Sequence, residues 1–155
     1  MFYIKLFRIL SFIIIFLFFA LSFHLTNIAW AKECPQKRKT ITAPKEFLEK
    51  VNPLRKEPRF VKEGKVLAHI KAKPLACKQC HGMNGDGLGA MAPNMSPKPR
   101  NFTCKPTMDQ VSDGQLFWII KNGSKATSMP PYSHLSDQTI WQLIHYIRSL
   151  SEEPV

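Results

Sequence analysis

The run Cys77-Lys78-Gln79-Cys80-His81 constrains the fold of this 155-residue chain more than any other feature. Two thiols separated by two residues on one turn can add to the two vinyl groups at one edge of a porphyrin, and the next residue then points its imidazole at the iron. C-x-x-C-H is the spacing of covalent haem attachment. It predicts one covalently bound haem c, joined to Cys77 and Cys80 by thioether bonds, with His81 as an axial ligand.

A structural disulfide or half of a zinc site would use the same spacing of Cys77 and Cys80. Zinc would require another pair of ligands at ribbon or finger spacing, and the sequence has no such pair. A thioredoxin-like pair would require a βαβ context, for which the sequence shows no pattern. Covalent haem attachment is therefore the favoured interpretation of the motif.

A six-coordinate iron needs a second axial ligand, and Met129, in Ser128-Met129-Pro130-Pro131-Tyr132, is the predicted one. It lies between two predicted helices, so a loop can bring its thioether over the haem face opposite His81. A His/Met pair raises the reduction potential relative to two histidines. The methionines closer to the motif are expected to be core residues: Met83, Met91, Met95 and Met108. Three other histidines are expected to be surface or structural residues, with a bis-histidine site left open: His69, His134 and His145.

Apolar periodicity predicts about three main helices and no strand. The first covers 60–70 and ends by Pro74. The second begins at the N-cap Ser112 and stops at Gly123. The third begins at Ser136 and carries apolar residues at helical spacing to Leu150. A short helix is also expected over 44–51, with one face formed by Phe47, Leu48 and Val51. The fold class is therefore all-α, and the Gly- and Pro-rich loop 82–104 is expected to wrap a cofactor.

The first 31 residues have the pattern of a signal peptide. Lys5 and Arg8 precede an apolar run over 9–23, and Ala29-Trp30-Ala31 provides the small residues for a cut before Lys32. An uncleaved membrane anchor is the alternative, because the apolar run is long for a signal peptide. Both interpretations predict an exported chain, either in the periplasm or anchored to the membrane and facing it.

Basic residues concentrate in the part that follows the signal. The net charge is +11, and 32–73 holds 13 Lys/Arg against 5 Asp/Glu, whereas 74–155 holds 7 against 6. Segment 32–59 is rich in Lys, Glu and Pro, and is expected to be an irregular arm that wraps the domain or is partly disordered. An exported chain rarely meets nucleic acid, so the charge suggests an acidic partner or an anionic membrane surface, or simply a solvated face.

Two cysteines remain outside the motif, Cys34 and Cys104. In an oxidising compartment they suggest a disulfide that joins the arm to the loop after the motif. Lipid attachment at Cys34 is disfavoured, because Lys32 and Glu33 occupy positions where a lipoprotein signal needs small apolar residues. Cys104 as an iron ligand is an open alternative.

Over 60–150 the sequence resembles the class I cytochrome c family. The matching segments are Cys77–Gly82, Gly85-Asp86-Gly87, Ala92-Pro93-Asn94, Met129-Pro130 and Trp141…Tyr146-Ile147-Arg148. The resemblance implies a cytochrome c domain over 60–155, wrapped around one haem. It also implies that the Pro93 carbonyl accepts a hydrogen bond from Nδ1 of His81, and that Gly64 and Tyr146 mark the contact of the first and last helices.

These features predict a single-electron carrier with no catalytic residues, working between a membrane oxidoreductase and a periplasmic or membrane-bound acceptor. One alternative is a haem relay subunit fixed in a larger complex. Another is a haem enzyme or sensor with an open iron site, which would require Met129 to be absent from the iron. The membrane is a partner only if the N-terminal segment is not cleaved.

Overall fold

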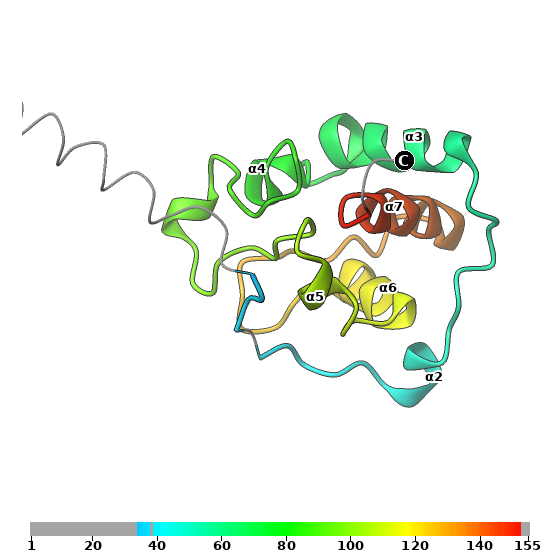
Figure 1. Cartoon of the computed structure of the whole chain (residues 1–155), viewed down its shortest axis with the longest axis horizontal. Coiled ribbons are helices and arrows are strands. Elements are labelled where there is room, and N and C mark those ends of the chain that lie inside the picture. The colour runs from blue at the N-terminus through cyan, green and yellow to red at the C-terminus, as the bar shows by residue number, and fades with distance from the viewer. Residues whose placement is uncertain (1–33, 38, 153–155) are drawn as a thin grey trace, which may run out of the picture. The chain divides into compact units, whose positions relative to one another are not determined.

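Helices of very different lengths make up the computed structural model, which describes residues 34–37 and 39–152 (Figure 1). This part of the chain contains no strand, and it forms one compact unit. The elements are α2 (Lys45–Leu48), α3 (Pro58–Val66), the π-helical η1 (Leu67–Lys71), α4 (Lys78–His81), the 3₁₀ turn η2 (Ala92–Asn94), α5 (Lys105–Met108), α6 (Asp113–Asn122) and α7 (Asp137–Ser149). The predicted all-α class is confirmed.

Helices α6 and α7 begin where the sequence predicted. Ser112 Oγ accepts a hydrogen bond from the N–H of Gln115 (3.1 Å), and Ser136 Oγ accepts one from the N–H of Thr139 (3.2 Å). These bonds satisfy N–H groups that have no partner inside the helix. The two helices supply most of the buried core, including Phe117, Ile140 and Ile144.

Helices α3 and α7 pack against each other and lie side by side in Figure 1. Their close approach is at Gly64. A Cβ atom at Gly64 would lie 2.3 Å from the Gln142 carbonyl oxygen and 2.9 Å from Cβ of Tyr146. Only a glycine allows the two backbones to approach this closely. The contact expected between Gly64 and Tyr146 is therefore confirmed.

The first predicted helix is present but changes its geometry along its length. Helix α3 covers Pro58–Val66 and continues as one π-helical segment, η1, to Lys71. The helix ends at Ala72, where the backbone becomes extended, which is two residues before Pro74. The residue preceding a proline is pushed away from the helical region, so the chain must leave the helix before Pro74.

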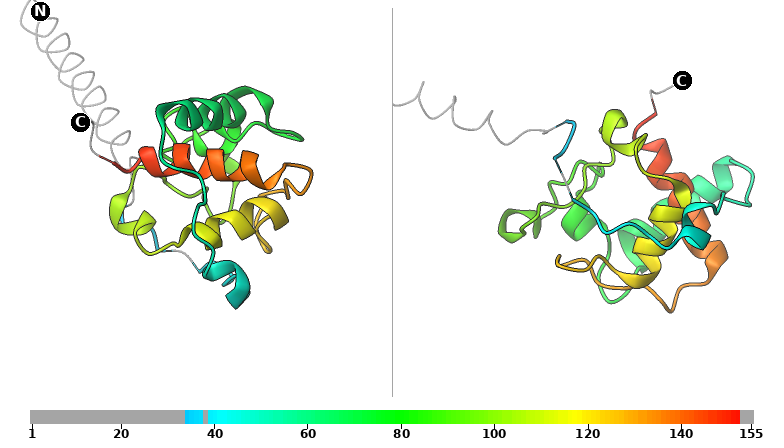
Figure 2. Two further views of the ribbon diagram at one scale, coloured as in Figure 1. Left: turned by 90° about the vertical axis from the view of Figure 1, so that its right-hand side faces the viewer. Right: turned by 90° about the horizontal axis from the view of Figure 1, so that it is seen from below.

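The described part of the arm wraps the domain. Oε1 of Gln115 accepts from the N–H of Ala43 (2.8 Å), and its Nε2 donates to the carbonyl of Ile41 (3.1 Å). Figure 2 shows, in its left view, the segment between α2 and α3 crossing α6 and α7. Asn52 Nδ2 donates to the Trp141 carbonyl in α7 (3.0 Å).

Helix α2 is shorter than predicted, and the expected common face of Phe47, Leu48 and Val51 is wrong. Phe47 packs on the core, whereas Val51 is 80% exposed. The chain leaves the helix after Leu48 in order to reach α7, and this turn points Val51 into solvent.

No helix among residues 34–37 and 39–152 is long and apolar enough to span a bilayer. The predicted signal peptide or anchor over 1–31 lies outside the residues that the structure describes.

Candidate haem site

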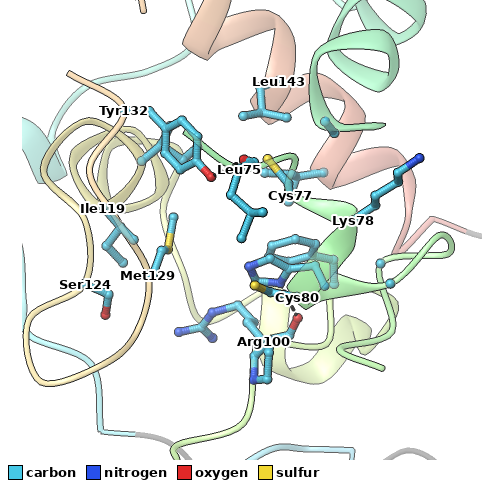
Figure 3. Close-up of a pocket in the computed structure, with 18 of the residues that line it drawn as sticks. Leu75, Cys77, Lys78, Cys80, Arg100, Ile119, Ser124, Met129, Tyr132 and Leu143 are labelled. Atoms are coloured by element: carbon cyan, nitrogen blue, oxygen red, sulfur yellow. Dashed lines mark hydrogen bonds between the residues drawn. The ribbon is translucent and has the colours of Figure 1, made fainter. Parts of the chain in front are cut away.

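Helix α4 is a single turn that carries the C-x-x-C-H motif. The N–H groups of Cys80 and His81 both donate to the carbonyl of Cys77, at 3.2 and 2.8 Å. This turn places the imidazole and the two thiols on the wall of one cleft, the central cleft. Figure 3 labels Cys77 and Cys80 there.

The central cleft contains about 1180 Å³ of space not filled by protein atoms, part of it open to solvent. Its walls are largely apolar and come from η1, α6 and α7 and from the segment before the motif: Ala68, Leu75, Leu116, Ile119, Ile120, Leu143 and Ile147. This lining suits a large apolar cofactor.

His81 is oriented by the segment that follows η2. Its Nδ1 lies 3.0 Å from the carbonyl oxygen of Arg100, and its ring stacks on Phe102 with centroids 4.3 Å apart. The N–H of Phe102 donates to the carbonyl of Gly85 (2.7 Å). When Nδ1 carries the proton and donates to Arg100, the lone pair is on Nε2, which is the arrangement that a metal ligand requires.

The carbonyl beside His81 is thus that of Arg100, and the expectation of Pro93 is wrong. The Pro93 carbonyl accepts instead from Nζ of Lys98 (2.7 Å). Pro93 lies in the short turn η2, which directs its carbonyl toward the lysine, and the chain returns beneath the imidazole only at 99–102. Within the described chain, the central cleft is lined by Pro97 and Pro99 and not by Pro93.

Met129 lies across the central cleft from Cys80 (Figure 3). Its N–H donates to Oγ1 of Thr127 and its carbonyl accepts from the N–H of Ser124, both at 3.2 Å. Gly123 makes this turn possible, since its φ is +74° and a Cβ there would lie 2.9 Å from the Met129 carbonyl oxygen. The structure therefore brings together Cys77, Cys80, His81 and Met129, four residues that the sequence singled out.

Tyr132 was not predicted as part of the site. Its hydroxyl donates to the carbonyl of Leu75 (2.6 Å), which joins the Met129 loop to the segment that leads into Cys77. Burial raises the pKa of this phenol, with smaller contributions from Cys77 and Cys80, so it stays protonated and can donate. Its position three residues after Met129, in a Pro-Pro-Tyr run, was the only signal in the sequence.

Of the histidines His69, His134 and His145, only His69 lines the central cleft. His145 Nε2 lies 3.0 Å from the Leu54 carbonyl, and the ring of His134 neighbours that of Tyr132. His69 does line the central cleft, with Nε2 2.7 Å from the hydroxyl of Tyr146. The pKa of His69 is lowered, first by burial and then by Lys65 and Lys78.

The electrostatics of the two motif thiols disfavour redox or metal-thiolate chemistry. Burial raises the pKa of Cys77 to about 11, and it raises the pKa of Cys80 as well. Reactive and metal-binding cysteines are instead found where the thiolate is stabilised. Among the described residues, no group of three or more His, Cys, Asp or Glu side chains could hold a metal ion.

Cys34 and Cys104 are joined in the structure, with their Cα atoms 5.6 Å apart. Cys104 is buried and is not among the described residues that line the central cleft. This arrangement attaches the arm to the start of α5 and gives no support to Cys104 as an iron ligand.

The residues present fit a covalently bound haem. Two thiols stand at one wall of an apolar cleft, and an imidazole and a thioether also line it. Arg100 contributes a cation to the same cleft, where its side chain appears in Figure 3. Cys77 and Cys80 would hold the porphyrin, His81 and Met129 the iron, and a haem would supply a one-electron couple there.

Comparison with known proteins agrees with this geometry. The family model described as cytochrome c oxidase, cbb3-type, subunit III matches residues 63–147, just over half of the chain. A solved chain of the Kuenenia stuttgartiensis reducing HAO-like protein complex is similar at 28% sequence identity and a TM-score of 0.56. The similarity covers 75% of the present chain and 53% of the solved one, so the present chain corresponds to about half of that relative. No curated protein matches the sequence.

Proposed function

The chain belongs to the monohaem c-type cytochrome family matched over 63–147, and on that premise we propose that it is an exported single-electron carrier with His/Met axial ligation. Membership of the family implies covalently bound haem c and electron transfer. The proposal adds one haem per chain, the ligand pair His81 and Met129, and a carrier that moves between partners.

The observation that carries the proposal is the placement of Met129 in the same cleft as His81. Both residues have fixed surroundings, His81 through the Arg100 carbonyl and Phe102, and Met129 through Thr127 and Ser124. A coordination shell that changes little between ferrous and ferric iron favours fast electron transfer, because little has to move. Occupation of both axial positions also excludes small substrates from the iron.

Each residue has a stated role under this proposal. The thiols of Cys77 and Cys80 form the thioethers, so the cofactor cannot dissociate. The imidazole of His81 donates through Nε2 while its Nδ1–H is directed at Arg100. The apolar walls keep water from the site, and the Met129 thioether, a soft ligand, favours the ferrous state.

The spectrum of the purified protein tests this function. Denaturing gels stained for haem peroxidase activity should show a coloured band, because thioether bonds survive denaturation. The ferric protein should show the weak far-red band of sulfur-to-iron charge transfer, and the ferrous protein should not bind carbon monoxide quickly. Absence of the band together with rapid carbon monoxide binding would favour an enzyme or a sensor with an open iron site.

A second candidate, a relay subunit fixed in a complex, is supported by the similarity to a chain of a multi-protein redox complex. Fractionation distinguishes the two. A free carrier should be recovered as a monomer in the periplasmic fraction, whereas a subunit should co-purify with larger haem proteins. A haem-stained band confined to washed membranes would instead support an uncleaved anchor at 1–31.

The excess of basic residues in 32–73, 13 Lys/Arg against 5 Asp/Glu, supports docking to an acidic partner. Lys45, Lys56 and Arg59 are well exposed, although each pairs with a nearby glutamate. If this charge steers association, the second-order rate of electron transfer should fall as salt shortens the Debye length to about 10 Å at 0.1 M. A rate indifferent to salt would leave the basic segment as a solvated face.

A further inference from the structure

Gln36, in the N-terminal arm, bonds the backbone on both sides of Arg100. Its Nε2 donates to the carbonyl of Pro99 (3.1 Å), and its Oε1 accepts from the N–H of Asn101 (2.7 Å). The two bonds use both ends of one planar amide, so they fix the orientation of the peptide groups between them as well as their position.

The peptide carbonyl between these two contacts is the one that faces His81. The oxygen of Arg100 lies 3.0 Å from Nδ1 of the imidazole. Because the direction of a carbonyl follows the backbone on either side of it, the two Gln36 bonds restrain the acceptor that faces His81.

The arm can exert this control because it is itself anchored. The backbone N–H of Gln36 donates to Oγ1 of Thr107 (3.0 Å), and Cys34 is bonded to Cys104 two residues earlier in the arm. Further along, Oγ1 of Thr40 accepts from Nη2 of Arg100 (2.9 Å). The arm therefore contacts the 99–107 segment at several points around the same carbonyl.

We propose that Gln36 is a positioning residue for the axial ligand His81, acting through the Arg100 carbonyl. This inference rests on the proposed function, since it takes His81 as the iron ligand. A well-placed acceptor at Nδ1–H raises the basicity of the ligating nitrogen. A more basic ligand favours ferric iron, so the contact lowers the reduction potential.

The test compares Gln36→Ala with Gln115→Ala in the holoprotein. Gln115 is a matched control, because its amide also makes two bonds between the arm and the domain, to Ala43 and Ile41, but neither reaches the segment beside His81. In the ferrous protein, solvent exchange of the His81 Nδ1 proton is measured by NMR, and the reduction potential by redox titration.

Gln36→Ala should speed exchange of that proton about tenfold, as expected when two hydrogen bonds that restrain the acceptor are lost. It should also raise the potential, whereas Gln115→Ala should leave both values close to wild type. Equal exchange rates and potentials in the two variants would overturn the inference while leaving the carrier function intact. A wild-type protein with no haem-shifted His81 signal would instead overturn the proposed function, and this inference with it.

Gln36→Glu provides a second measurement if the alanine variant yields little holoprotein. The glutamate keeps an acceptor for the N–H of Asn101 but cannot donate to the Pro99 carbonyl. Exchange of the His81 Nδ1 proton should be faster than in wild type, but by less than in Gln36→Ala. The potential is not compared in this variant, because the added carboxylate charge lowers it by itself. A wild-type exchange rate in Gln36→Glu would count against the proposal.

Discussion

Nε2 of His69 lies 2.7 Å from the hydroxyl of Tyr146 on the wall of the central cleft. The pKa of His69 is lowered in the folded protein, first by burial and then by Lys65 and Lys78, so the folded state resists protonation of this imidazole. Between the ordinary pKa of 6.5 and the lowered pKa of the folded state, the unfolded chain binds a proton that the folded chain does not. The free energy of unfolding should therefore fall as pH drops through 6.5 toward the lowered pKa of the folded state.

His69→Gln should reduce that dependence on pH, because glutamine can still bond the Tyr146 hydroxyl but does not titrate. Denaturant unfolding of both holoproteins at several pH values provides the comparison. The loss of stability between neutral pH and the region below 6.5 should be smaller in the variant. Equal losses in the two proteins would show that other groups account for the dependence.

Met129→Ala should remove the far-red absorption of the ferric protein and lower the reduction potential, because a soft ligand that favours ferrous iron is lost. It should also allow rapid binding of carbon monoxide or cyanide. Met95→Ala is the matched control, since Met95 lines the same cleft. If Met95→Ala and not Met129→Ala abolished the band, the ligand assignment would be wrong.

Tyr132→Phe should loosen the loop that carries Met129, since it removes the 2.6 Å bond to the Leu75 carbonyl. The free energy of unfolding should fall by about 1–2 kcal/mol, and carbon monoxide should bind the ferrous variant faster than wild type. Tyr146→Phe is the control, because it removes a tyrosine hydroxyl that is bonded to His69 instead of to Leu75. Similar rates of carbon monoxide binding in the two ferrous variants would argue against a role for Tyr132 in holding Met129.

Arg148 should contribute much more to stability than an ordinary surface cation. Its guanidinium bonds Oδ1 of Asp113 (2.7 Å) and the carbonyls of Met108 (2.8 Å) and Val111, which ties α7 to the start of α6. Arg148→Ala should lower the free energy of unfolding by about 2–4 kcal/mol, because partly buried acceptors lose their donor.

Lys105→Ala is the control for Arg148→Ala, because the ion pair between Lys105 and Asp109 is exposed to solvent. Its expected cost is about 0–1 kcal/mol. Thermal or denaturant unfolding of both variants measures the difference. Comparable losses would mean that the Arg148 contacts add nothing beyond a surface ion pair.

The Cys34–Cys104 bond should stabilise the domain by restricting the unfolded chain. The two residues are separated by 70 positions, for which the chain-entropy model gives roughly 3–5 kcal/mol. Cys34→Ser should lower the free energy of unfolding accordingly. Alkylation under denaturing conditions without reductant, followed by peptide mapping, tests the bond directly. Modification of both cysteines in protein from an oxidising compartment would refute it.

Local signals in the sequence are sufficient to predict the main helices. The caps Ser112 and Ser136 and the apolar spacing that follows them depend only on residues within a few positions, and the structure begins α6 and α7 there. The motif from Cys77 to His81 is equally local, since its chemistry requires a fixed spacing on one turn. For this reason short-range spacing identifies both the helices and the motif residues expected at the cofactor.

The carbonyl that orients His81 was decided by the tertiary structure alone. The carbonyl that faces His81 belongs to Arg100 and not to Pro93, because η2 turns the Pro93 carbonyl toward Lys98. A position about a dozen residues after the histidine suggested Pro93, but a Gly- and Pro-rich loop has no periodicity from which its path can be read. Only the folded chain shows which carbonyl passes beneath the ring.

The sequence by itself determined the all-α class, the starts of the two long helices and the motif that carries the cofactor chemistry, because these depend on short-range spacing. The tertiary structure decided that the arm packs against the domain and that Gln36, Tyr132 and Arg100 join the surroundings of the site. Each of these residues acts through a partner more than 40 positions away or at the end of an irregular loop. Such pairings depend on how the whole chain packs around the cleft, and no local pattern encodes them.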